Sequence, residues 1–169
     1  MDLSNMTYGQ NNDFSRPEGS LKGQRLRGTA FALLAKREYS RQELKSKLLL
    51  YGACPIELEP LLAELTGNNY QSDERMAGML VRANIRKGRG PARIQQDLKK
   101  HHIDAELAED DLEEVNWLQQ AIVLRMGKFG ETLPTDQKEK ARQVRFLQYR
   151  GFDLSICLKA IHQNEIEEQ

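Results

Sequence analysis

The sequence predicts an all-α fold in which short helices form an array of similar units. From Leu26 onward, capping and turn signals divide the chain into short amphipathic stretches, and none alternates apolar and polar residues with the period of a strand. Leu48, Leu98 and Leu147 occupy matching places in three of these stretches, at separations of 50 and 49 residues. A period of about fifty residues with three helices per unit is typical of helical repeat proteins.

The first unit begins with an apolar run, residues 26–35, that predicts a helix ending before Ser40. Ser40-Arg-Gln-Glu43 is a capping box, in which each end residue can bond the backbone amide of the other. Leu44 and Leu48 follow one turn apart and should face a core.

The segment from Pro55 to Leu65 predicts the third helix of this unit, but Pro60 lies inside it. A proline there removes a backbone hydrogen bond. The helix therefore either starts near Pro60 or is kinked at that residue.

The second unit opens at Ser72, followed by two acidic residues that suit the positive first turn of a helix continuing to Lys87. Pro91 starts the next helix, since proline at the first position costs little. Ile94 and Leu98 then repeat the spacing of the leucine pair in the first unit.

The remaining helices are expected to begin at Asp104 and Asn116, at a Thr135 cap with an end at Gly151, and at Asp153. The positions that should face the core in these helices are Leu107, Leu112, Val115, Leu118, Ile122, Val123, Ala141, Val144, Leu147, Ile156, Leu158 and Ile161.

Composition argues for a cytoplasmic protein without a membrane partner. The longest apolar run among the 169 residues is Ala30 to Ala35, whereas a membrane helix needs about twenty. The first ten residues lack the basic start and apolar core of a signal peptide, and two cysteines make no disulfide framework. Residues 1–24 show no apolar period and are expected to form a flexible tail.

The balance of 25 basic and 25 acidic residues hides a strong separation of charge along the chain. Residues 75–103 carry eight basic side chains and one acidic one, Asp97, whereas residues 104–114 carry seven acidic side chains and no basic one. Such blocks create local fields that suit nucleic acid, or a protein assembled on nucleic acid. The acidic block could also serve a basic partner, neutralise neighbouring helices or favour solubility.

Arg75, Arg82, Arg86 and Arg89 recur at steps of seven, four and three residues, which places them along one helix face unless Gly88 moves Arg89 into the following turn. The basic region is extended by Lys87, Arg93, Lys99 and Lys100. Guanidinium groups suit phosphate or carboxylate partners because each offers paired donors. The alternative is a solvated helix face.

A second row consists of Lys138, Arg142, Arg145 and Tyr149, followed directly by Arg150. Basic side chains that end in an aromatic ring are typical of single-stranded nucleic acid binding, in which charges meet phosphates and rings stack on bases. The alternative is again a solvated face, with Tyr149 covering a helix junction.

We expect no catalytic activity, cofactor or metal. The chain contains neither a phosphate-binding GxxxxGK[ST] loop nor a GxGxxG motif. His101 and His102 are adjacent and would point about 100° apart on a helix, a poor arrangement for chelation. Cys54 and Cys157 are expected to be inert, buried thiols.

Four segments carry motifs that occur together, in this order, in one known family: residues 35–44, 72–77, 82–91 and 145–152. The third reads arginine-lysine-glycine-x-glycine-proline from Arg86, and the fourth reads arginine-phenylalanine-leucine-x-x-arginine-glycine-phenylalanine. These motifs resemble those of the RecX regulatory proteins, and the match covers roughly residues 26–162.

The sequence departs from that pattern at three positions. Pro60 interrupts a helix, Arg89 stands where an aromatic residue is common, and Tyr149 replaces the first of two usual arginines.

The resemblance implies three tandem three-helix repeats forming an extended, curved array. The expected divisions are a flexible tail at 1–24, repeats at 25–68, 69–115 and 116–163, and an acidic tail at 164–169. It also implies a regulator that binds the RecA recombinase and its filament on single-stranded DNA, and that mainly inhibits filament growth, ATP hydrolysis, strand exchange and coprotease activity. We expect a monomer.

Two other functions fit the residues. One is a helical protein that binds DNA independently of a recombinase, which the arginines permit and the zero net charge weakens. The other is a non-catalytic helical scaffold with solvated charged faces.

Overall fold

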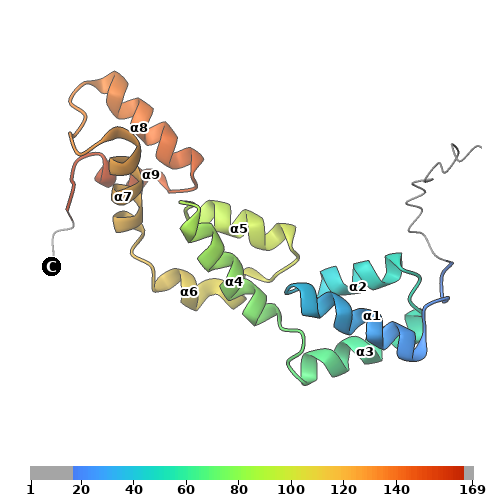
Figure 1. Ribbon diagram of the computed structural model, residues 1–169. Coiled ribbons are helices and arrows are strands. Elements are labelled where there is room, and N and C mark those ends of the chain that lie inside the picture. Colours follow the sequence, from blue (N-terminus) through green and yellow to red (C-terminus); the bar gives the residue numbers. More distant parts are fainter. Residues whose placement is uncertain (1–16, 166–169) are drawn as a thin grey trace, which may run out of the picture. The chain divides into compact units, whose positions relative to one another are not determined.

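A computed structural model of the protein describes residues 17–165, mostly as helices joined by short turns (Figure 1). The chain divides into two compact units between Gln71 and Ser72. Within the described residues, the only extended pairing is an isolated bridge between Leu21 and Ala53. The prediction of an all-α fold is confirmed.

In the described part of the first unit the chain forms three helices: α1 (Gly23–Lys36), α2 (Arg41–Leu50) and α3 (Pro55–Gly67). The start of α2 is capped as expected, because the Ser40 hydroxyl accepts a hydrogen bond of 3.1 Å from the Glu43 amide. The helical leucines that form the core between these helices are Leu26, Leu33, Leu44, Leu48, Leu58, Leu61, Leu62 and Leu65.

Pro60 lies inside α3, which runs from Pro55 through it to Gly67. The alternative of a helix that starts near Pro60 is therefore wrong. Pro55 occupies the first turn, where no intrahelical donor is needed. At Pro60 the missing donor leaves the carbonyl of Ile56 unbonded within the helix, and the high exposure of Ile56 lets water reach it.

The predicted N-terminal tail extends too far into the chain. Leu21 is only 4% exposed and packs in the core of the first unit. Its amide donates to the Gly52 carbonyl and its carbonyl accepts from the Cys54 amide, both at 2.9 Å, and α1 begins at Gly23. A single leucine among polar residues has no period, so the pattern alone did not reveal it; residues 1–16 of the predicted tail lie outside the described residues.

Two hydrophobic clusters build the second unit. The first lies among α4 (Asp73–Arg86), α5 (Pro91–Lys100), the 3-10 turn η1 (Ala105–Ala108) and α6 (Glu109–Glu113), and the second among α7 (Trp117–Phe129), α8 (Gln137–Tyr149) and α9 (Leu154–Ala160). Trp117 packs against both clusters, and its indole N–H donates to the Leu112 carbonyl at 3.1 Å. This one side chain therefore links the two clusters.

Two helix starts differ from the prediction. The Asp104 side chain accepts from the Glu106 amide and opens a 3-10 turn, so the expected acidic helix shrinks to η1 and the five residues of α6. Asp136, not Thr135, caps α8 by accepting from the Glu139 amide at 2.7 Å. Four positions expected to face the core are exposed instead, namely Leu107, Val123, Ala141 and Leu158.

The turn between α4 and α5 is joined by backbone hydrogen bonds to the turn between α8 and α9. The Gly90 amide donates to the Arg150 carbonyl at 2.7 Å, and the Ala92 amide donates to the Gly151 carbonyl at 3.1 Å. The glycine-proline and arginine-glycine-phenylalanine motifs, about sixty residues apart in sequence, are thus one contact in the folded protein.

Glycine is required on both sides of this contact. A Cβ on Gly90 would lie 2.6 Å from the carbonyl carbon and oxygen of Gly151. A Cβ on Gly151 would lie 2.8 Å from the backbone nitrogen of Arg93, and Gly151 also has a φ of 101°, which favours glycine. No side chain can fit between the two backbones without separating them.

We predict that Gly90→Ala and Gly151→Ala each lower the free energy of unfolding by about 1–3 kcal/mol, because the added methyl group overpacks the contact. Gly28→Ala and Gly127→Ala are matched controls, since a Cβ at either helical position meets no atom within 4 Å. The controls should gain up to about 1 kcal/mol from helix propensity. Urea denaturation measures the free energy of unfolding of all four variants. Wild-type stability of both Gly90→Ala and Gly151→Ala would contradict the contact.

Candidate functional site

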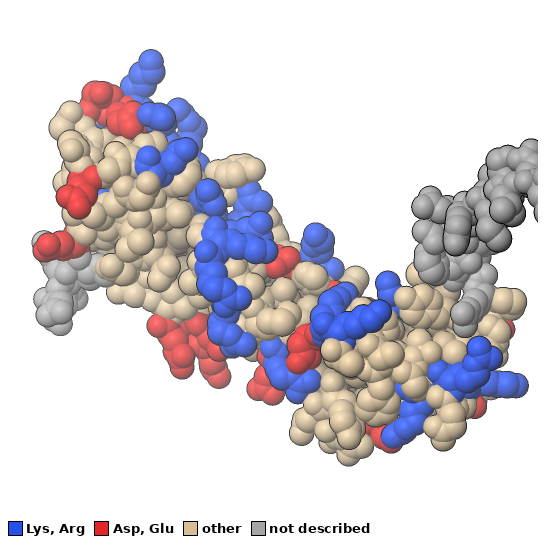
Figure 2. Space-filling view, viewed as in Figure 1, with Lys and Arg blue, Asp and Glu red and all other residues tan. Residues whose placement is uncertain are grey.

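A concave region with a volume of about 470 Å³ lies beside the glycine contact in the second unit, and we call it the basic hollow. Its cationic lining residues are Arg86, Lys87, Arg89, Lys128 and Arg150, and its apolar ones are Ile85, Val123, Leu124, Phe146 and Phe152. None of the described residues that line it is acidic. Figure 2 shows basic side chains gathered in a band over α4, with acidic side chains near α6 beside it.

Three cations of the basic hollow are available to a ligand. Within residues 17–165, no hydrogen bond or ion pair engages the side chains of Arg86, Lys87 and Lys128. Arg86 and Lys87 end α4, and Lys128 lies in the last turn of α7. Basic side chains at these positions complement the negative ends of the helix dipoles and still present their charges to solvent.

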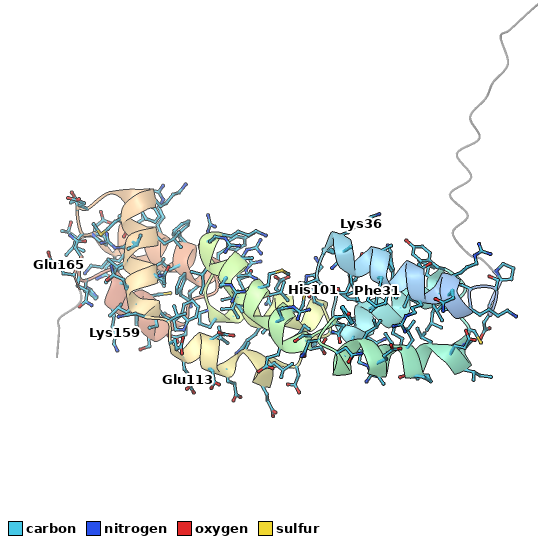
Figure 3. The ribbon with its side chains drawn as sticks, turned by 60° about the horizontal axis from the view of Figure 1, so that its bottom comes forward. Phe31, Lys36, His101, Glu113, Lys159 and Glu165 are labelled. Carbon is cyan, nitrogen blue, oxygen red and sulfur yellow. The ribbon has the colours of Figure 1, made fainter. Side chains whose placement is uncertain are left out.

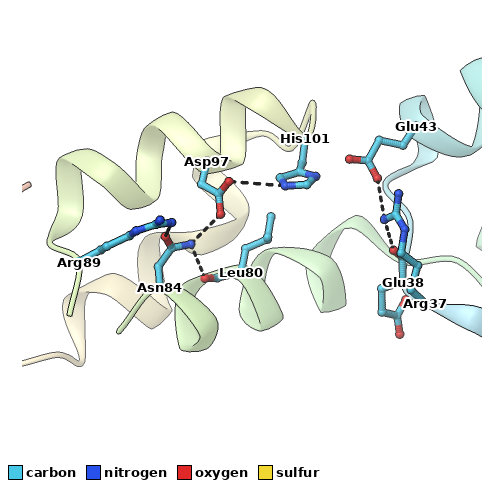
Figure 4. A network of polar contacts seen from close by, with 8 residues as sticks. All are labelled: Arg37, Glu38, Glu43, Leu80, Asn84, Arg89, Asp97 and His101. Atoms are coloured by element: carbon cyan, nitrogen blue, oxygen red, sulfur yellow. Dashed lines mark hydrogen bonds and ion pairs between the residues drawn. The ribbon is translucent and has the colours of Figure 1, made fainter. Parts of the chain in front are cut away.

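Arg89 is held by a polar network (Figure 4). Its guanidinium donates to the Asn84 carbonyl oxygen Oδ1 at 3.1 Å, and the Asn84 amide donates to the Leu80 carbonyl at 2.8 Å and to Asp97 Oδ2 at 2.7 Å. Asp97 also lies 3.5 Å from His101. The one acidic residue of the basic block therefore orients Asn84, which in turn orients Arg89.

Arg150 and Arg93 form hydrogen bonds across the glycine contact and also lie at the protein surface. The Arg150 guanidinium donates to the Lys87 carbonyl at 3.3 Å and lies 5.3 Å from the centre of the Phe146 ring. Arg93 donates to the Tyr149 carbonyl at 2.9 Å, and its guanidinium lies 4.6 Å from the Tyr149 ring, which is 73% exposed. Both arginines cross from one helical cluster to the other.

The predicted row of four arginines is divided in the structure. Arg75 and Arg82 line a separate concave region, with a volume of about 460 Å³, that Asp110 and Asp111 also line. The Arg82 guanidinium and the Asp111 carboxylate both come within 4 Å of the Cβ position of Gly78. Arg82 therefore has acidic neighbours that the near absence of acidic residues in positions 75–103 did not predict, because the turn at η1 brings the acidic block back against α4.

The other predicted residues lie outside the basic hollow. Lys99 and Lys100 are exposed in the last turn of α5. Lys138, Arg142 and Arg145 are exposed along α8, where Arg142 pairs with Glu139 at 3.5 Å and lies 5.2 Å from the Phe129 ring centre. Acidic side chains of α6, Glu113 among them, project away from the helices (Figure 3).

Arg125, whose side chain is fully buried in α7, was not among the residues predicted from the sequence. Its guanidinium donates to the Asn164 side chain, whose amide donates to the Glu131 carbonyl at 2.8 Å. Burial lowers the pKa of Arg125 below its ordinary value. Because Arg125 follows Ala121 and Ile122 by four and three residues, its place on the inward face could have revealed it.

Neither of two other kinds of site is formed by the residues described. No group of three or more His, Cys, Asp and Glu side chains in this part of the chain is arranged to hold a metal ion. In the same residues, no helix has the length and apolar character needed to cross a membrane.

The fold and the basic hollow define a helical repeat protein, and comparison with known proteins identifies its family. Family models for the second and third three-helix domains of RecX match residues 72–112 and 114–161. The chain is 48% identical over 147 residues to the regulatory protein RecX of Acinetobacter baylyi, covering 87% of this chain and 92% of that protein. The chain therefore belongs to the RecX family.

Other relatives agree. The regulatory protein RecX of Halorhodospira halophila is 37% identical over 137 residues, covering 80% of this chain and 85% of that protein. A crystal structure of RecX from Lactobacillus salivarius has a TM-score of 0.74 at 19% identity, covering 83% of this chain and 95% of that one. The structural likeness supports the fold, and the sequence relatives make this chain a RecX-type regulatory protein.

We predict that Asn164→Ala lowers the free energy of unfolding by about 2–3 kcal/mol, because it leaves a buried guanidinium without its partner. Arg125→Met removes the charge and the donors together and should cost less. Urea denaturation of the two variants makes the comparison. A greater loss for Arg125→Met than for Asn164→Ala would contradict it.

We predict that Cys54 is alkylated by iodoacetamide well before Cys157 at pH 8. Burial, together with the nearby Asp153 charge, raises the pKa of Cys157 to about 11, whereas Cys54 is half-buried. A raised thiol pKa stabilises the fold at pH values below the unfolded pKa of about 8.5, and this contribution is lost as pH rises toward 11. Peptide mass spectrometry gives the two rates, and equal rates would contradict the burial.

Proposed function

We propose that this protein binds the RecA recombinase filament on single-stranded DNA and limits its growth. Limiting the filament would reduce ATP hydrolysis, strand exchange and coprotease activity, and so modulate DNA recombination, repair and the SOS response in the cytoplasm. The observation that carries the proposal is the basic hollow, where five cations surround one concave region and no acidic side chain is found among the described residues that line it. The protein would act as a non-catalytic monomer.

The charge distribution supports a partner made of both DNA and protein. Arg86, Lys87 and Lys128 present unpaired charges that suit phosphates or carboxylates. The exposed acidic residues of α6 suit a basic protein surface. A nucleoprotein filament offers all of these groups within one groove, whereas bare DNA offers only phosphates and bases.

The contribution that we propose for each of the other predicted binding residues depends on its neighbours in the structure. Tyr149 with Arg93, and the exposed row on α8, extend the proposed interface from the basic hollow. Arg75 and Arg82 face carboxylates of their own chain and should contribute less. A protein that binds DNA independently of the recombinase would use the same hollow, and the test below separates the two functions.

We predict that the double variant Arg86→Ala, Lys128→Ala needs at least tenfold more protein for half-inhibition of recombinase ATP hydrolysis on single-stranded DNA. Each charged interface contact removed should cost about 1–3 kcal/mol, and 1.4 kcal/mol corresponds to tenfold. Lys36→Ala, Lys159→Ala is the control, since both lysines are exposed and the net charge changes equally. Figure 3 labels both residues.

Equal inhibition by the two double variants would contradict the assignment of the basic hollow. Absence of inhibition by the wild-type protein, with binding to bare DNA retained, would favour the independent DNA-binding function.

A further inference from the structure

Apolar side chains line the basic hollow beside the cations, and contacts to phosphate alone do not explain them. Val123 lies on α7 and is 57% exposed, although its neighbour Ile122 is buried in the core. Leu124 and Phe146 continue this surface from α7 and α8. An apolar lining beside unpaired cations is suited to a ligand that carries both a flat apolar part and a negative charge.

One flat polar surface is already fixed within the hollow. The Arg150 guanidinium is held by the Lys87 carbonyl and by the Phe146 ring, so its position is set before any ligand arrives. Guanidinium planes and aromatic rings are surfaces on which nucleobases stack. Arg86, Lys87 and Lys128, whose side chains have no partner among the described residues, remain to meet anions.

We propose that the basic hollow binds one nucleotide unit of single-stranded DNA. The base rests on Val123, Phe146 and the Arg150 guanidinium, and the flanking phosphates meet Arg86, Lys87 and Lys128. A volume of about 470 Å³ lies within the usual range for small-ligand pockets, about 300–1,000 Å³. A base within a duplex is stacked and paired and cannot enter, so the hollow selects single strands.

This proposal deepens the proposed function by naming the part of the filament that the hollow contacts, and it rests on that function. An acidic peptide would also meet these cations. It would leave the exposed Val123 side chain and the Arg150 guanidinium plane without a flat apolar partner, so the nucleotide accounts for more of the surface.

Gly127 allows the apolar lining to be tested without removing a charge. It lines the hollow from the last turn of α7, and a Cβ there meets no atom within 4 Å. Gly127→Phe would therefore fill the hollow while every cation remains. Gly28→Phe is the matched control, because Gly28 is also helical with open space at its Cβ position but lies in α1.

The experiment measures binding of a fluorescent oligothymidylate to the full chain by anisotropy, over a series of salt concentrations and without recombinase. Gly127→Phe should weaken binding at least tenfold with an unchanged salt slope, because it removes base contact and retains the charges. Lys128→Ala should weaken binding and reduce the salt slope by about 1. Gly28→Phe should bind the oligothymidylate as tightly as the wild type does. Gly127→Phe should leave the affinity for a duplex of equal length unchanged.

Equal binding by Gly127→Phe and Gly28→Phe would overturn the proposal, as would undetectable binding by the wild type at low salt. If Gly127→Phe lost binding to polyglutamate but kept wild-type binding to oligothymidylate, the hollow would bind an acidic peptide and the proposal would be overturned. Photocrosslinking of wild-type protein to an oligonucleotide that carries 4-thiothymidine needs no variant; it should label peptides of α7 or α8, and labelling confined to α1–α3 would overturn the proposal. The inhibition assay above fails or succeeds separately, so the two claims are distinguishable.

Discussion

The contact between the backbones of Gly90 and Gly151 is the constraint on which the second unit depends. Two hydrogen bonds and the absence of two side chains bring the α4–α5 turn against the α8–α9 turn. Once these turns meet, Arg150 can reach the Lys87 carbonyl and Arg93 can reach the Tyr149 carbonyl. The basic hollow is therefore a consequence of how two helical clusters are joined, since residues from both line it.

The basic side chains of the second unit differ in what surrounds them. Arg75 and Arg82 face carboxylates that the chain brings back against α4, and Arg125 is taken out of water altogether with an asparagine as its partner. The cations of the basic hollow have no acidic neighbour among its described lining residues, so a charge that the chain itself leaves unbalanced is concentrated there. The charged side chains of residues 75–103 are nearly all basic in sequence, and folding places them in these different surroundings.

Local signals predicted the helices well, because caps and periods depend on residues a few positions apart. Ser40 and Asp153 cap the helices that their positions predict, and Pro91 starts α5. The glycine motifs could be recognised by resemblance, but their contact joins residues about sixty positions apart, and no local period encodes such a pairing. The same limit explains why Val123 was expected in the core and why Asp110 and Asp111 were not expected beside Arg82.

Hydrogen exchange of the full chain, with and without recombinase filaments on single-stranded DNA, tests the central claim most directly. If the basic hollow meets the filament, binding should slow exchange of backbone amides in residues 85–92, 123–130 and 146–152, which line the hollow or adjoin it. The amides of α1, α2 and α3 then serve as an internal reference. Protection confined to those three helices, with none at the hollow, would contradict the account.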